Sequence, residues 1–161
     1  MSLPRLKEFL DSRGIKYVVI SHSVAYTAQG IAALAHIPGQ ELAKTVVTKI
    51  DGRFAMVVVP ASRLVDLALL RAATRSNTVE LASEMEFQNK FPDCEKGAMP
   101  PFGNLYDMDV FADESLSQDK EIAFNAGSHR ELIRLAWDDF ERLVKPTVVR
   151  LARALKADKA A

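Results

Sequence analysis

Residues 45–60 read Thr-Val-Val-Thr-Lys-Ile-Asp-Gly-Arg-Phe-Ala-Met-Val-Val-Val-Pro. An Asp-Gly pair between two runs of β-branched and apolar residues is among the strongest short-range signals of a β-hairpin. The stretch therefore predicts two strands that are joined at Asp51 and Gly52. Lys44 directly precedes the first strand, so we expect it at the mouth of the hairpin.

Helical and strand patterns alternate irregularly on both sides of this hairpin. Apolar spacing, Pro and Gly predict the helices 4–13, 27–36, 65–72, 84–91 and a helical tail from 138 to 159 that Pro146 interrupts. β-Branched and apolar runs predict the further strands 17–20, 105–112, 122–125 and 132–135. The regular alternation of a doubly wound parallel sheet is missing, so we expect an α+β, or mixed α/β, domain.

Composition bounds the kind of protein. A chain of 161 residues fits a single domain, 1–161, and 48% hydrophobic with 26% charged residues is typical of a globular protein. Lys plus Arg and Asp plus Glu are equal at 21 each, so any contact with RNA must be local, and we expect no DNA partner. The longest apolar stretch, 54–61, is far shorter than a membrane helix, and no signal peptide is evident. We therefore expect a cytoplasmic protein without a membrane partner.

Two loops and one lysine are candidate site features. Residues 97–103, Gly-Ala-Met-Pro-Pro-Phe-Gly, predict a rigid non-helical loop, which holds either a ligand or merely two strands. Residues 125–129, Asn-Ala-Gly-Ser-His, offer backbone N–H groups for an anion or oxyanion, or form an ordinary Asn-x-Gly turn. Lys44 either reaches into a cleft or is a solvated surface residue. Composition alone leaves these alternatives open.

Other chemistries have little support in the sequence. The three histidines lack a close metal-ligand spacing, and Cys94 is the only cysteine, so we expect neither a metal nor a cofactor. Cys94 would be a nucleophile only if a histidine approached it in space. No Gly-x-Ser-x-Gly, Walker or dinucleotide motif is present. Basic residues of the tail would contact RNA phosphates or form a solvated helix face; these are Lys145, Arg150, Arg153, Lys156 and Lys159.

Four motifs occur together in a recognisable order: Lys44-Thr45, the 97–103 loop, Phe-Asn-Ala-Gly-Ser-His at 124–129, and 138–146. Over about residues 17–151 the chain resembles the YbaK/ProX family of aminoacyl-tRNA editing domains, which also occur as an insertion in bacterial prolyl-tRNA synthetases. The resemblance implies a mixed, barrel-like β-sheet wrapped by helices. It also implies a pocket for the 3′-terminal adenosine of tRNA and its esterified amino acid, and hydrolysis of a mischarged aminoacyl-tRNA in trans.

The resemblance assigns roles to particular residues. The implied catalytic residues are Lys44, Gly97, Pro101 and Gly127. The implied substrate-binding residues are Thr45, Met99, Pro100, Phe102, Asn125, Ser128 and His129. Several relatives carry asparagine where this chain has Thr45, so their amino-acid selectivity does not transfer.

The implied substrate is a small amino acid on tRNA(Pro) or a similar tRNA, and the resemblance also points to an aminoacyl-tRNA synthetase as a further partner. Since no protein nucleophile is evident, we expect water to attack with help from the substrate's own ribose hydroxyl or amino group. Backbone N–H groups of the two loops would stabilise the oxyanion, and Lys44 would anchor the terminal phosphate or ribose. The alternatives are a non-catalytic module that binds tRNA or a nucleotide, and a metal-dependent hydrolase.

Overall fold

The computed structural model describes residues 4–23 and 28–154. The described helices are α1 (Pro4–Ser12), α2 (Ala28–Ala35), α3 (Leu67–Thr74), α4 (Glu84–Phe87) and α5 (Trp137–Val144). The described strands are β1 (Tyr17–Ser21), β2 (Ala43–Ile50), β3 (Arg53–Pro60), β4 (Arg63–Val65), β5 (Val79–Leu81), β6 (Asp109–Asp113), β7 (Glu121–Asn125), β8 (Glu131–Ala136), β9 (Thr147–Val149) and β10 (Ala152–Ala154). Short 3₁₀ helices cover Gln88–Lys90, Gly103–Leu105 and Glu114–Gln118.

The predicted hairpin is confirmed as β2 and β3. The two strands pair antiparallel from Ala43 opposite Pro60 to Ile50 opposite Arg53. Asp51 and Gly52 form the turn with φ of 49° and 83°, and positive φ at both positions is the conformation that Asp-Gly favours in two-residue hairpins. β2 and β3 lie at the centre of a five-stranded sheet in the order β5-β2-β3-β6-β9.

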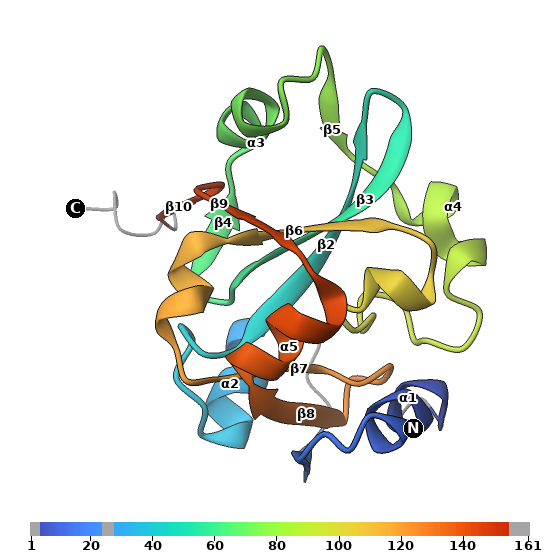
Figure 1. Ribbon diagram of the computed structural model, residues 1–161, viewed down its shortest axis with the longest axis vertical. Coiled ribbons are helices and arrows are strands. Elements are labelled where there is room, and N and C mark those ends of the chain that lie inside the picture. Colours follow the sequence, from blue (N-terminus) through green and yellow to red (C-terminus); the bar gives the residue numbers. More distant parts are fainter. Residues whose placement is uncertain (1–3, 24–27, 155–161) are drawn as a thin grey trace.

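A second sheet, in the order β1-β8-β7, meets the first sheet at the start of β2. Leu42 bridges Ala123 in parallel, and the Ala123 N–H donates to the carbonyl oxygen of Glu41 at 2.9 Å. Figure 1 shows β2 running from the upper hairpin down to the region of β7, β8 and α2. The beginning of β2, which carries Lys44, is therefore placed where two sheets join.

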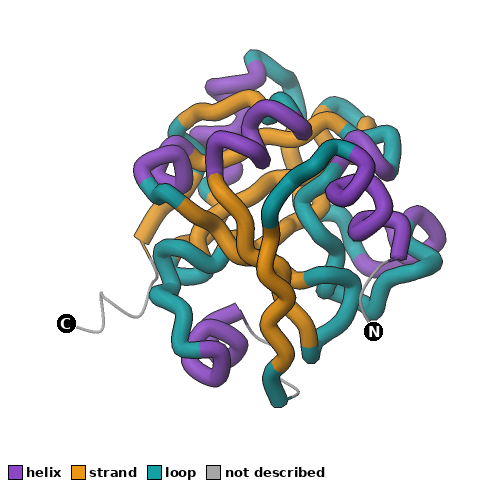
Figure 2. Tube along the Cα trace, turned by 60° about the horizontal axis from the view of Figure 1, so that its bottom comes forward, coloured by secondary structure: helices purple, strands orange, loops and turns teal. Residues whose placement is uncertain are grey.

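Helices lie around the strands, as Figure 2 shows, and the α+β prediction is confirmed. The described strands form three separate sheets, the third being the pair β4 and β10, rather than one closed barrel. Phe102 is fully buried in the main core, with its ring centroid 6.2, 5.4 and 5.6 Å from those of Phe9, Phe124 and Phe140. Within 4–23 and 28–154, no helix is both long and apolar enough to span a membrane.

The predicted helical tail is wrong after α5. The helix ends at Val144, its C-terminal cap Lys145 has φ of 54°, and Pro146 follows. Residues 147–149 then pair in parallel with β6, and 152–154 pair with β4. Thr-Val-Val at 147–149 is β-branched, and available edges on β6 and β4 favour strands over the helical pattern. Arg150 and Arg153 therefore do not lie on a helix, while Lys156 and Lys159 lie outside the described residues.

The predicted strand over 105–112 begins too early. Leu105 ends a 3₁₀ helix that starts at Gly103, and β6 spans only Asp109–Asp113. The chain turns at Gly103, whose carbonyl oxygen accepts hydrogen bonds from the N–H groups of Tyr106 and Met108, each at 2.9 Å. A turn that is closed by two hydrogen bonds to one carbonyl oxygen therefore occupies the first half of the predicted strand.

Asp113 holds the chain after β9 against the end of β6. It is buried, and its Oδ1 accepts from the backbone N–H of Leu151 and Ala152 at 2.9 and 3.0 Å. Its Oδ2 accepts from the backbone N–H and the hydroxyl of Ser115. Burial alone would raise the pKa of Asp113, but these hydrogen bonds outweigh burial and lower it.

We expect Asp113→Asn to destabilise the protein by about 2 kcal/mol at pH 7, because an amide cannot accept all of these bonds and loses the charge that strengthens them. A carboxylate whose pKa is lowered on folding stabilises the fold above the ordinary aspartate pKa of about 3.9, and this is lost as pH falls through the lowered value. The difference between wild type and variant in denaturant unfolding should therefore shrink towards pH 3. An unchanged difference over this range would contradict the assignment.

Candidate functional site

Hydrogen bonds join the two loops that the sequence singles out. The Gly127 N–H donates to the carbonyl oxygen of Ala98 at 2.9 Å, and the Glu95 N–H donates to the carbonyl oxygen of Gly127 at 2.8 Å. The His129 N–H donates to Glu95 Oε1 at 2.8 Å, and His129 Nε2 lies 2.6 Å from the carbonyl oxygen of Lys96. The loops at 95–98 and 127–129 therefore form one unit although about thirty residues separate them.

Both glycines of this unit have backbone conformations that other residues avoid. Gly97 has φ of 79° and Gly127 has φ of 94°. A Cβ on Gly97 would lie 3.7 Å from Cε1 of His129, which is ordinary contact, so backbone strain rather than space favours glycine there. Glu95 is not among the residues predicted to form the site. Its importance depends on contacts with 127–129, and no local pattern at 93–96 indicates them.

Lys44 lies level with Asn125. Leu42 bridges Ala123 in parallel, so Lys44 and Asn125 each lie two residues beyond the point where the two strands meet, with Asn125 at the end of β7. Leu42 and Lys44 project from the same face of β2 because alternate strand residues share a face. Thr45 projects from the opposite face. Lys44 and Asn125 thus lie next to the hairpin turn that carries 127–129, whereas the side chain of Thr45 points away from Lys44.

The Lys44 ammonium is partly buried and forms no ion pair with any described residue. Burial lowers the pKa of Lys44, because removal from water disfavours the charged form. Lys49 on the same strand instead pairs with Glu80 and Glu86. Buried charges in proteins are normally paired, so an unpaired, partly buried ammonium is a group for which a ligand anion or oxygen would be favourable.

Buried polar side-chain atoms without a partner occur on β2, on β7 and directly after β1, among other places. Buried atoms without a hydrogen-bond partner in the described part of the chain include Asn125 Oδ1, Thr45 Oγ1 and His22 Nε2. Each such atom calls for an explanation, and one explanation is that a ligand supplies the hydrogen-bond partner. Asn125 and Thr45 are among the residues that the resemblance assigns to substrate binding. His22 is not, and its only sequence signal is a histidine directly after a strand.

Backbone donors in the two loops divide into engaged and available groups. Gly127 donates to Ala98, so its own N–H is engaged. Within the described residues, the N–H groups of Gly97, Met99 and Ser128 have no hydrogen-bond acceptor. Ser128 is buried, and its hydroxyl oxygen accepts from the N–H of Arg130 at 3.2 Å. An oxyanion at this unit would thus meet Gly97, Met99 or Ser128 rather than the N–H of Gly127.

The second half of the 97–103 loop is buried. Pro100, Pro101 and Gly103 are buried, and Phe102 lies in the aromatic core described above. Pro100 and Pro101 have fixed φ angles, and the core residue Phe102 directly after them anchors this part of the loop. This half of the loop holds Gly97 and Met99 in place from inside the protein.

Cys94 lies near the same loop, but its surroundings suit a protonated thiol. Its Sγ lies 3.5 Å from Tyr106 Oη, and burial raises the pKa of Cys94 to about 11. A nucleophilic cysteine needs a lowered pKa. Its hydrogen-bond partners among the described residues are Tyr106 and Asp93 rather than a histidine, so the condition set for a nucleophile is not met.

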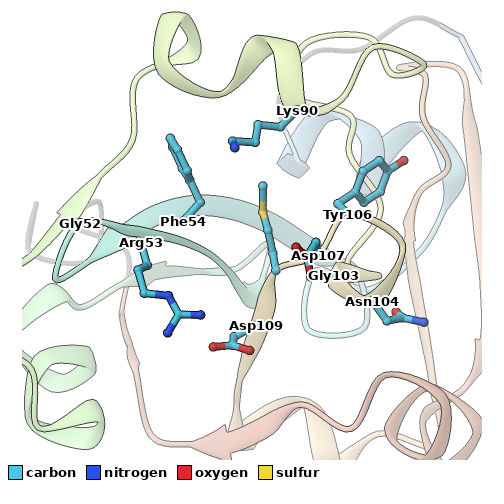
Figure 3. A pocket seen from close by; sticks show the side chains of 10 residues that line it. Gly52, Arg53, Phe54, Lys90, Gly103, Asn104, Tyr106, Asp107 and Asp109 are labelled. Carbon is cyan, nitrogen blue, oxygen red and sulfur yellow. The ribbon is translucent and has the colours of Figure 1, made fainter.

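A cavity of about 480 Å³ lies at the far end of the 97–103 loop, beyond Gly103. Figure 3 shows Arg53 and Asp109 on one side of it and Lys90 and Tyr106 on the other. Lys90 lies 5.0 Å from the ring centroid of Phe54. Residues to which the resemblance assigns a catalytic or binding role do not line this cavity, so it is separate from the unit formed by the two loops.

Across the described ranges, three or more His, Cys, Asp or Glu side chains do not come together as a possible metal site. His22 and His129 are both engaged with backbone carbonyl oxygens.

Comparison with known proteins gives consistent matches. The family model of the aminoacyl-tRNA editing domain matches residues 22–143. The chain is 27% identical over 154 residues to the multifunctional Ser/Thr-tRNA deacylase ProXp-y of Escherichia coli (strain K12), covering 92% of each protein. It is 34% identical over 104 residues to a proline–tRNA ligase of Staphylococcus saprophyticus, covering 63% of this chain and 18% of the ligase.

A solved structure of a candidate trans-editing enzyme for prolyl-tRNA synthetase superimposes with a TM-score of 0.79. The identity is 21%, and the match covers 93% of this chain and 96% of the other. At this identity the likeness shows a shared fold. The expected editing-domain fold is therefore confirmed.

Proposed function

The chain belongs to the aminoacyl-tRNA editing domain family, and we propose that it hydrolyses the ester bond of a mischarged aminoacyl-tRNA in trans. The observation that carries the proposal is the partly buried Lys44 ammonium, which has no ion-pair partner among the described residues and lies level with Asn125. The similar Ser/Thr-tRNA deacylase, matched over 92% of each protein, supports a hydrolase rather than a binding module alone.

In the proposed reaction, a water oxygen attacks the carbonyl carbon of the ester. The carbonyl oxygen becomes an oxyanion, for which N–H groups of Gly97, Met99 or Ser128 are donors. The bond between the carbonyl carbon and the ribose oxygen then breaks, and the ribose oxygen takes the proton that the water gives up. The vicinal ribose hydroxyl or the amino group of the substrate relays this proton. Lys44 anchors the terminal phosphate or ribose and so orients the ester.

The other residues assigned by the resemblance are proposed to shape the pocket. Pro101 and Gly127 would hold the two loops in place, Asn125 would lie beside them, and the buried His129 would act from within the unit that it joins. Met99 and Pro100 would contact the amino acid, while Phe102 would act from the core. Thr45 would contribute its buried hydroxyl from the other face of β2.

We propose a small amino acid as the group removed, on tRNA(Pro) or a similar tRNA. The E. coli relative is named as a Ser/Thr-tRNA deacylase. The proline–tRNA ligase is similar to this chain over part of its length. The solved structure of a candidate trans-editing enzyme for prolyl-tRNA synthetase shares the fold. A pocket that discriminates by size gains only about 1 to 3 kcal/mol per methylene. We therefore expect serine, threonine, alanine and cysteine esters to be cleaved with different rates rather than one ester alone.

A panel of tRNAs charged with these amino acids and with proline tests the proposal. Release of free amino acid that depends on Lys44 supports the deacylase, and the ranking of rates identifies the substrate. Binding of the charged tRNA without release would overturn it in favour of the non-catalytic module. Loss of activity with a chelator, restored by a divalent metal, would instead favour the metal-dependent hydrolase.

A further inference from the structure

The ring of His22 has a defined tautomer. His22 directly follows β1, and its backbone N–H donates to the carbonyl oxygen of Arg130 at 2.9 Å. Its Nδ1 lies 2.6 Å from the carbonyl oxygen of Ser23. Because a carbonyl oxygen only accepts hydrogen bonds, Nδ1 carries the proton of the neutral ring. Nε2 is then an acceptor.

This acceptor is buried, and no described residue donates to it. Leaving a buried acceptor without a partner is unfavourable, and such atoms are uncommon in native proteins. The contact between Nδ1 and Ser23 restrains the ring, so a donor that arrives from a ligand meets an acceptor that is already oriented. His22 is therefore prepared for a ligand rather than for a contact within the described chain.

His22 projects from the same sheet face as Asn125. Leu132 on β8 is paired with Ile20 on one side and with Asn125 on the other. Residues directly opposite each other in a sheet share a face, and residues two apart along a strand do so as well. Ile20 and Asn125 thus share a face, and His22 follows two residues after Ile20.

His22 and Lys44 also lie at the same edge of this face. β1 and β7 are both antiparallel to β8, and β2 runs parallel to β7 at the Leu42 bridge. All three strands therefore run in one direction, which brings His22 and Asn125 to the same end and Lys44 level with Asn125. Three strand spacings separate β1 from β2, or roughly 15 Å. An aminoacylated adenosine is of this size.

We propose that His22 Nε2 accepts a hydrogen bond from a donor beside the scissile ester of the aminoacyl-tRNA, which makes His22 a substrate-binding residue. The inference rests on the deacylase function proposed above. Two groups beside the ester donate: the vicinal hydroxyl of the terminal ribose and the α-ammonium of the amino acid. Lys44 and His22 then hold the substrate from two sides of the same edge.

A pair of substitutions at His22 separates the acceptor from the rest of the ring. His22→Asn keeps a donor near the position of Nδ1 but has no atom at Nε2, whereas His22→Gln places an oxygen near Nε2. We expect His22→Asn to lower kcat/KM about tenfold, and His22→Gln to recover most of the loss. His36→Asn is the matched control, because His36 is exposed and has φ of 58°, which asparagine tolerates.

Modified substrates identify the donor. One is a tRNA that ends in 2′-deoxyadenosine and is charged on its 3′-hydroxyl, and the other is an acyl-tRNA without the α-amino group. If the ribose hydroxyl is the donor, the tenfold effect of His22→Asn disappears on the first substrate; if the ammonium is the donor, it disappears on the second. An effect that is equal on all three substrates would show a merely structural role and overturn the inference.

The outcomes distinguish this inference from the proposed function. Deacylation that depends on Lys44 but is unchanged by His22→Asn would overturn the inference and leave the function standing. If the wild-type protein released no amino acid, the proposed function would fail, and His22 would be tested by binding of a non-hydrolysable, amide-linked aminoacyl-adenosine. About tenfold weaker binding by His22→Asn would still support the hydrogen bond, and equal binding would refute it.

Discussion

Replacement of Lys44 by methionine is expected to lower kcat/KM for deacylation at least about tenfold and to leave the fold intact. Methionine keeps the unbranched apolar stem but removes the ammonium. A charge-assisted hydrogen bond contributes about 1.5 to 3 kcal/mol, which corresponds to roughly ten- to 150-fold in rate. Single-turnover release of amino acid from the best substrate of the panel measures the effect directly.

The same substitution also tests a prediction about the stability of the fold. Burial lowers the pKa of Lys44, so folding disfavours its charge, and no described carboxylate compensates. Lys44→Met should therefore leave the melting temperature unchanged or raise it. An activity loss that is accompanied by a clear loss of stability would contradict the assignment of Lys44 to the substrate.

Lys49→Met is the matched control on the same strand. Lys49 pairs with Glu86, and its side chain is only 22% exposed, but it lies near the other end of β2. Removing a surface ion pair costs little. We expect this variant to retain wild-type kcat/KM. If both lysine variants lost activity to the same extent, a general effect on β2 would replace the specific role of Lys44.

Local patterns predicted the parts of the fold that local forces determine. The Asp-Gly turn at 51–52 and the β-branched runs around it are sufficient for a hairpin, because turn and strands agree. The tail at 147–154 shows the opposite case. Its strands exist because β6 and β4 offer edges to pair with, and Asp113 fixes the chain between them through Leu151 and Ala152. Such partners lie far away in sequence, so helical spacing prevailed in the prediction.

In the candidate site, too, local motifs predicted some features, whereas others depend on segments that are distant in sequence. Lys44, Gly97 and Gly127 were identified through motifs, and two of the three have a backbone reason in the structure, namely positive φ. The bonds that Glu95 makes to 127 and 129 and the unsatisfied Nε2 of His22 depend on how distant segments meet. No spacing rule reveals them. Gly103 is a further residue whose role the motif does not reveal, because in the 97–103 motif it looks equivalent to Gly97.

Replacement of Gly103 by alanine is expected to destabilise the protein by at least about 3 kcal/mol, more than a typical overpacked site. A Cβ there would collide with the carbonyl oxygen of Met108 and lie 2.5 Å from Cγ2 of Val110. The backbone cannot easily retreat, because Gly103 accepts two backbone hydrogen bonds and follows the core residue Phe102. For a chain of this size the melting temperature should fall by roughly 6 to 12 °C.

Gly39→Ala and Gly97→Ala are comparison variants for the stability loss expected of Gly103→Ala. The Cβ at Gly39 would meet Ser62 at 3.4 Å without positive φ, so we expect a change within about 0.5 kcal/mol. The Cβ at Gly97 has room, and only its φ of 79° opposes alanine, at about 1 to 2 kcal/mol. Gly97→Ala should thus retain the fold but perturb deacylation, since Gly97 lies beside the proposed oxyanion donors. Equal melting temperatures for the variants at 97 and 103 would refute this division, in which one glycine shapes the site and the other allows the core to close.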